Sequence, residues 1–126
     1  MKKIIQTNDA PAPIGPYNQA VLSGNTLYIS GQIAINPVDG KLVLSTIQEE
    51  TEQVMRNLKA VLTAAEMNFE NVVKSSIFIN DMNNFTEINS IYSKYFKEET
   101  APARETVEVA NLPKFVNVEI SMIAVK

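Results

Sequence analysis

The sequence predicts a single α+β domain over residues 1–126, in which two helices cover one face of a mixed β-sheet. Residues 46–66 and 85–96 each carry apolar side chains three and four positions apart, the pattern of an amphipathic helix with one buried stripe. The segments around them alternate between apolar and polar residues or are rich in Val and Ile, which predicts strands. Because each helix has a single apolar stripe, the two helices can cover only one side of the sheet.

The N-terminal third predicts a short strand over 2–6, an irregular loop and a hairpin. Residues 10–16 hold three prolines and a glycine, which suppress both helix and ladder. A Gly24–Asn25 turn then connects residues 20–22 to a longer strand over 27–35.

In the strand over 27–35, strict alternation predicts two faces. Leu27, Ile29, Ile33 and Ile35 share the apolar face, and Tyr28, Ser30, Gln32 and Ala34 share the polar one. Gly31 falls on the apolar side without a side chain. We therefore expect a bulge there, or the close approach of another group.

The middle of the chain predicts a turn at 36–40, a possible return strand at 41–43 and then the first helix. Thr46 and Glu49 have the spacing of a capping box at its start. Residues 72–79 predict a strand, residues 81–84 a turn and cap, and Phe85 begins the second helix.

Two alternating segments at the C-terminus, 102–109 and 116–123, predict a β-hairpin whose connection contains Pro113. The register that gathers the apolar residues on one face makes Arg104 and Glu119 diagonal neighbours on the other. From these residues alone, a cross-strand ion pair of little energetic weight is the simpler interpretation. The alternative is a site, since a guanidinium fork binds carboxylates and a carboxylate can move protons.

Composition excludes several classes of chemistry. The chain has no His and no Cys, so serine and cysteine triads, disulfides and the usual zinc ligands are absent. A net charge of −3 without a basic run argues against nucleic-acid binding. No apolar run approaches membrane-spanning length and no signal-peptide pattern follows Met1, so we expect no membrane association and a cytoplasmic location.

Two further polar positions have a structural and a functional interpretation. Tyr17 follows the proline-rich loop and either covers a core edge or forms a pocket wall. Asn89 lies beside the apolar stripe of the second helix, where its amide needs a partner, either as a helix-to-strand tie or as a pocket donor. The uncovered sheet face is mixed in polarity, which predicts a cyclic homo-oligomer.

Taken together, several short runs resemble the RidA family of imine deaminases. They are spread in order along nearly the whole chain: Ile14–Tyr17, Ser30–Gln32, Asp81–Phe85, Ile88–Asn89, Tyr92, Pro102–Arg104, Val107–Ala110, Leu112–Lys114 and Val118–Ile120. The resemblance implies a chorismate-mutase-like fold, assembled as a homotrimer with a site in each cleft between subunits.

The same resemblance implies hydrolysis of 2-iminopropanoate and 2-iminobutanoate, which leave pyridoxal-phosphate dehydratases, to 2-oxo acids and ammonia. No metal or cofactor is implied. Arg104 would hold the substrate carboxylate, and Glu119 would orient and deprotonate water. Tyr17 would pack on the substrate; the remaining pocket residues would be Ser30, Gly31, Asn89 and Thr106.

The chain departs from the resemblance at three positions. Glu105 and Thr106 stand where many relatives have Ser and Cys, and Asn111 stands where relatives often have Arg. Glu105 would weaken anion capture if it points inward. Two other functions stay open: a regulatory protein that binds 2-oxo acids without turnover, and, with less support, a translation-inhibiting ribonuclease.

Overall fold

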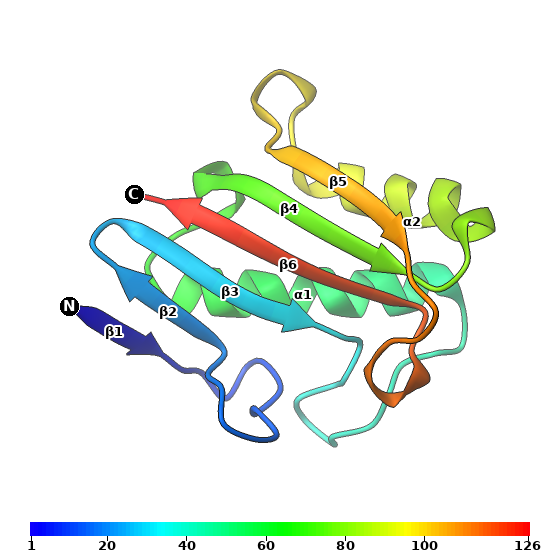
Figure 1. The fold of residues 1–126 in the computed structure, drawn as a ribbon, viewed down its shortest axis with the longest axis horizontal. Helices are drawn as coiled ribbons and strands as arrows, with labels where there is room; N and C mark the ends of the chain where they lie inside the picture. Colours follow the sequence, from blue (N-terminus) through cyan, green and yellow to red (C-terminus); the bar gives the residue numbers. More distant parts are fainter.

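The computed structural model describes all 126 residues as one mixed sheet with two α-helices packed on one face (Figure 1). The strands are β1 (Lys2–Ile5), β2 (Ala20–Ser23), β3 (Thr26–Gln32), β4 (Val72–Ile79), β5 (Ala103–Glu108) and β6 (Val118–Val125). The α-helices are α1 (Ile47–Ala64) and α2 (Phe85–Tyr92). Short 3₁₀ turns span Phe69–Asn71, Met82–Asn84, Ser93–Tyr95, Glu98–Thr100 and Pro113–Phe115. The predicted α+β class, with two helices on one face of a mixed sheet, is confirmed.

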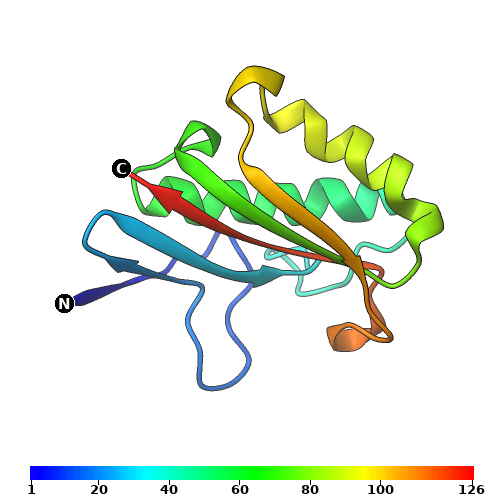
Figure 2. The same cartoon turned by 45° about the horizontal axis from the view of Figure 1, so that its top comes forward.

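The strand order is β1-β2-β3-β6-β4-β5, and every neighbouring pair is antiparallel except β4 and β5. Helix α2 connects the parallel strands β4 and β5, which makes a βαβ unit, as the tilted view in Figure 2 shows. Helix α1 lies behind the centre of the sheet on the same side. The opposite side of the sheet is left uncovered.

The predicted C-terminal hairpin is wrong, because β4 lies between β5 and β6. Strand β5 pairs only with β4, and Arg104 is the partner of Ser75. Strand β6 pairs with β3 on its other side. Alternation fixes which side chains share a face of one strand, but it does not choose the neighbouring strand. The long segment between β5 and β6 exceeds the usual hairpin loop, which allows β6 to pass to the far side of β4.

Helix α1 supplies much of the core through Val54, Leu58, Val61 and Leu62, each fully buried. Thr46 caps the helix, since its side-chain oxygen accepts a hydrogen bond from the backbone N–H of Glu49, as the capping pattern predicts. Burying one aliphatic side chain of this kind stabilises the fold by about 1.5–3 kcal/mol.

A second tie joins α1 to the sheet through the buried carboxylate of Glu50. It accepts hydrogen bonds from the backbone N–H of Asn117 at 2.8 Å and of Val118 at 3.2 Å, and from the Asn117 amide at 2.7 Å. These bonds hold the start of β6, just before Glu119.

A β-bulge interrupts β3 between Ile29 and Gln32. The bulge turns Gln32 and Ala34 toward the core, where both are buried, so their predicted place on the polar face is wrong. The expected return strand at 41–43 is reduced to a single bridge between Ile35 and Leu42. None of the helices combines the length and hydropathy that crossing a lipid bilayer requires.

Candidate active site

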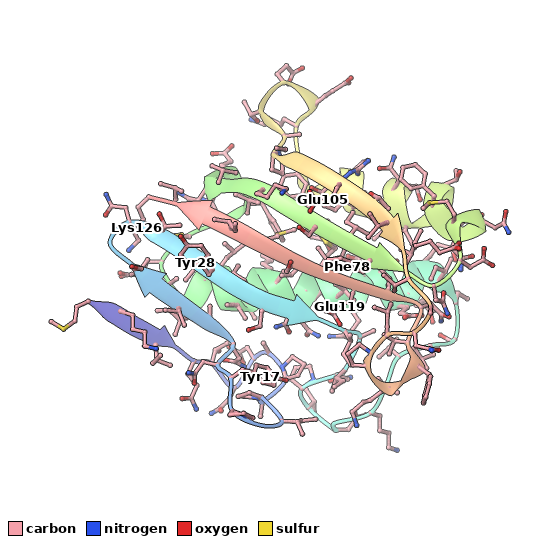
Figure 3. All side chains as sticks on the ribbon, viewed as in Figure 1. Tyr17, Tyr28, Phe78, Glu105, Glu119 and Lys126 are labelled. Atoms are coloured by element: carbon pink, nitrogen blue, oxygen red, sulfur yellow. The ribbon has the colours of Figure 1, made fainter.

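The carboxylate of Glu119 lies on the uncovered face of the sheet, at one wall of a cleft of about 520 Å³. Figure 3 shows Glu119 on the same side of the sheet as Tyr28, Phe78 and Glu105. The carboxylate is half-buried and makes no hydrogen bond or ion pair within the chain. Burial raises the pKa of Glu119 above its ordinary value, because desolvation disfavours the charged form. A carboxylate with a raised pKa is suited to accepting and returning protons.

Gly31 makes room for this carboxylate. A Cβ added to Gly31 would lie 2.8 Å from Cδ and 3.0 Å from Cγ of Glu119, closer than side chains pack. The sequence predicts either a bulge or the close approach of another group at Gly31, and the structure has both: the bulge in β3 and the Glu119 carboxylate.

Tyr17 and Ser30 line the same cleft, together with Pro11, Ala12, Ile14, Gln19, Gly31, Gln32, Ile33, Ile35, Pro113 and Lys114. The Tyr17 hydroxyl accepts a hydrogen bond from the backbone N–H of Ile14 at 3.2 Å, which fixes the ring against the proline-rich loop. Ser30 donates to the carbonyl oxygen of Asn18 at 2.6 Å. Four residues named from the sequence thus come together: Tyr17, Ser30, Gly31 and Glu119.

Part of the cleft lining is a strained turn. Lys114 and Phe115 are consecutive residues with φ of 55° and 56°, in the left-handed region that side chains disfavour. Such strain costs about 1–3 kcal/mol per residue and tends to occur at functional sites. The turn brings Lys114 to the cleft and leaves the Phe115 ring largely exposed.

Arg104 belongs to a second group, between the edge strand β5 and helix α2. Its Nη1 donates to Oδ1 of Asn89 at 2.7 Å, and its guanidinium carbon lies 5.1 Å from the ring centre of Tyr92 and 5.7 Å from that of Phe85. The other guanidinium N–H groups make no hydrogen bond within the chain. Arg104, Asn89 and Tyr92 line an open groove of about 640 Å³.

The expected proximity of Arg104 and Glu119 on one polar face is wrong. Arg104 is paired with Ser75, whose side chain is buried on the helix side, so Arg104 faces α2. Glu119 is paired with Phe78 and faces away from the helices. One chain therefore carries two candidate half-sites, the Glu119 cleft and the Arg104 groove, on opposite faces of the sheet.

The family model described as endoribonuclease L-PSP matches residues 7–126. A RutC family protein of Pyrococcus horikoshii is 48% identical to this chain over 126 residues, which are 100% of this chain and 99% of that relative. A Bos taurus protein named 2-iminobutanoate/2-iminopropanoate deaminase is 46% identical, over 100% of this chain and 91% of that relative. The chain belongs to this family, known also as YjgF/RutC/RidA.

The solved structure of E. coli TdcF with bound serine is similar to this chain, with a TM-score of 0.92 and 40% identity, and the match covers 98% of each chain. The family resemblance expected from the sequence motifs is thereby confirmed, and so is the single α+β domain with its mixed sheet and two helices.

Glu105 and Thr106, which stand where many RidA-family relatives have Ser and Cys, both lie outside the cleft and the groove. Glu105 faces away from Arg104 and forms an ion pair with Lys74 at 2.9 Å. The hydrogen bond from Ser76, followed by the Lys74 contact, lowers the pKa of Glu105. Glu105 therefore does not oppose anion binding at Arg104. The Thr106 hydroxyl is buried without a hydrogen-bond partner, and it lines neither the cleft nor the groove.

Sequence reasoning missed two sets of residues that hold the half-sites. Gln19 is buried and fixes the proline-rich loop, because its side-chain amide bonds to backbone groups of Thr7, Ala10 and Pro11. Tyr92 and Ser75 lie beneath the Arg104 guanidinium. No three His, Cys, Asp or Glu side chains gather anywhere in the chain as metal ligands.

Proposed function

We propose that this protein is a cofactor-independent deaminase, which hydrolyses reactive 2-imino acids such as 2-iminopropanoate and 2-iminobutanoate to 2-oxo acids and ammonia. The observation that carries the proposal is the half-buried, partnerless carboxylate of Glu119 in a cleft. The name of the bovine relative gives the reaction class. The unused N–H groups of Arg104 supply the matching anion-binding half.

The proposed assembly is a homotrimer in which Arg104 of one chain meets Glu119 of a second copy. The uncovered sheet face supports this, because it exposes apolar side chains, among them Tyr28, Val107 and Val125. The two half-sites also lie on opposite faces of the sheet, so a single chain cannot bring them to one small substrate. A cyclic assembly presents one face of each chain to the edge of the next.

In the proposed complex, Arg104 binds the substrate carboxylate through parallel N–H groups, with Asn89 fixing its remaining edge. The cleft residues Tyr17 and Ser30 and the backbone of Gly31 surround the carbon chain. Thr106 would touch the substrate only if its side chain moved, because its hydroxyl is buried where β5 pairs with Ile77 of β4. A substrate held at both ends gains the rate advantage of fixed orientation.

The chemistry then needs water and one carboxylate. Ionised Glu119 takes a proton from water, and the oxygen adds to the carbon of the protonated imine to give a carbinolamine. Protonated Glu119 returns the proton to the nitrogen. The C–N bond then breaks as the hydroxyl passes its proton to the Glu119 carboxylate and its oxygen forms the carbonyl. Ammonia leaves with the bonding electron pair and takes up the proton from Glu119 as ammonium, which returns the carboxylate to its ionised form. The raised pKa of Glu119 suits these transfers.

A coupled assay tests the proposal. Threonine dehydratase supplies the imine, and formation of 2-oxobutanoate is timed with and without this protein. Wild type should accelerate formation, and Arg104→Ala should abolish the acceleration while the assembly survives gel filtration. Arg56→Ala, at an exposed position on α1 far from both half-sites, is the matched control and should behave as wild type.

The regulatory alternative gives a different pattern in the same experiment. A protein that only senses 2-oxo acids would bind 2-oxobutanoate in calorimetry, with Arg104 required, yet leave the rate of imine hydrolysis unchanged. Absence of acceleration by wild type would remove the deaminase proposal.

A further inference from the structure

The guanidinium of Arg104 is held in place by a buried pair beneath it. Arg104 is exposed on an edge strand, where a long side chain ordinarily samples many rotamers. Here it rests against the ring of Tyr92, with 5.1 Å between guanidinium carbon and ring centre. That distance is within the range of a cation–π contact.

Tyr92 is itself fixed from below. It is 4% exposed, and its hydroxyl donates a hydrogen bond to Oγ of Ser75 at 2.9 Å. Burial, more than any other influence, raises the pKa of Tyr92, so the phenol stays protonated and remains a donor. The ring also packs against Phe96, with ring centres 4.8 Å apart.

Ser75 closes the arrangement. It is fully buried on β4 and is the direct pairing partner of Arg104 across the parallel ladder. The contacts therefore form a closed circuit, which runs from Arg104 on β5 to Tyr92 on α2, to Ser75 on β4, and back through the ladder. The Phe85 ring lies 5.7 Å from the same guanidinium carbon, and Asn89 accepts a hydrogen bond from one N–H group.

We propose that Tyr92 and Ser75 are positioning residues that preset the Arg104 guanidinium for a planar carboxylate. This inference rests on the proposed function for the identity of the ligand, but not for the immobilisation itself. An arginine ordered in advance loses less rotamer entropy when the carboxylate binds. Removing the support should therefore weaken ligand binding and leave the chemistry at Glu119 intact.

Three variants dissect the circuit. Tyr92→Leu removes the ring, whereas Tyr92→Phe keeps the ring and removes only the hydroxyl that reaches Ser75. Ser75→Ala removes the acceptor of that hydroxyl. Tyr95→Phe is the matched control, because the Tyr95 hydroxyl bonds to Glu52 and its ring contacts Phe69, not Arg104.

The first measurement is the Nε–H signal of Arg104 in ¹⁵N NMR, assigned by its loss in Arg104→Lys. We expect the order parameter of this N–H bond to fall in Tyr92→Leu to the range of a flexible group, below about 0.6, and to fall by less in Tyr92→Phe and Ser75→Ala, because the ring no longer restricts the guanidinium. Tyr95→Phe should match wild type. An unchanged order parameter in Tyr92→Leu, with native circular dichroism, would overturn the proposal.

The second measurement separates positioning from general damage. In the coupled assay, KM should rise about tenfold in Tyr92→Leu and about threefold in Tyr92→Phe and Ser75→Ala. In all three variants kcat should stay within about twofold of wild type. A fall in kcat at unchanged KM would also overturn the proposal. If wild type itself fails to accelerate hydrolysis, the deaminase proposal fails, and the NMR comparison still decides the role of Tyr92 and Ser75.

Discussion

Replacing Gly31 by alanine would put a methyl group against the carboxylate of Glu119. The added Cβ would lie 2.8 Å from Cδ and 3.0 Å from Cγ of that side chain. The obstructing atoms are the flexible end of a glutamate, so Glu119 should swing away and the backbone should stay in place. A rotamer shift of this kind costs about 1 kcal/mol.

The stability of Gly31→Ala should stay close to that of wild type. Gly31 does not have the positive φ found at Gly15, Gly24 and Gly40, so alanine is tolerated by the backbone. Loss of glycine freedom in the unfolded chain contributes about 0.4–1 kcal/mol in the opposite direction to the rotamer cost. The melting temperature should therefore move by roughly 4 °C at most.

Activity should respond very differently. A displacement of about 1 Å of a reacting group can cost about 10²-fold in rate. We expect a loss of that order in kcat in the coupled dehydratase assay. A carboxylate pushed toward solvent would also lose part of its desolvation, so the pKa of Glu119 should fall and the acidic limb of the pH–rate profile should move to lower pH.

Gly24→Ala is the control, because it should lower stability and leave kcat unchanged, the reverse of Gly31→Ala. Gly24 has a φ of 59° and no atom within 4 Å of an added Cβ, in the turn between β2 and β3. Alanine there should cost about 1 kcal/mol of stability and leave kcat unchanged. Full activity in Gly31→Ala, with an unshifted pH profile, would refute the placement of Glu119 as the base.

Three further predictions follow from the described contacts. Glu119→Gln should abolish activity and yet raise the melting temperature at mildly alkaline pH. Because folding raises the pKa of Glu119, the wild-type protein loses stability as the pH rises through that pKa, and the glutamine variant does not. In acid, where Glu119 is protonated, the two melting temperatures should agree. Glu50→Ala should cost about 3 kcal/mol in urea unfolding because it leaves buried N–H groups unpaired, whereas the exposed neighbour Glu49→Ala should cost far less. Glu105→Ser should change kcat/KM by no more than about twofold, because Glu105 forms an exposed ion pair with Lys74 and faces away from Arg104.

Local signals in the sequence predicted the elements well. The strand at 72–79, the cap at Thr46 and the crowding at Gly31 all depend on neighbours in the chain or on one side-chain pattern. Asn89 was expected to need a partner beside the apolar stripe of its helix, and that partner is Arg104.

These local signals do not determine which strands pair with one another in the sheet. The alternation in β5 and β6 is equally compatible with a hairpin and with two strands separated by β4. The bulge after Ile29 reverses the faces of Gln32 and Ala34, and strict alternation cannot anticipate an inserted residue. Because the sequence does not show that β4 lies between β5 and β6, it predicts Arg104 and Glu119 side by side, although they lie on opposite faces of the sheet.

In the proposed trimer, Arg104 of one chain and Glu119 of another complete a single site. Co-expression of Arg104→Ala and Glu119→Gln chains tests it, with each variant inactive alone. In randomly mixed cyclic assemblies, about a quarter of the interfaces would join an intact Arg104 half to an intact Glu119 half. We therefore expect about this fraction of wild-type activity to return in the coupled assay. Assemblies that demonstrably contain both chains and yet remain inactive would contradict it.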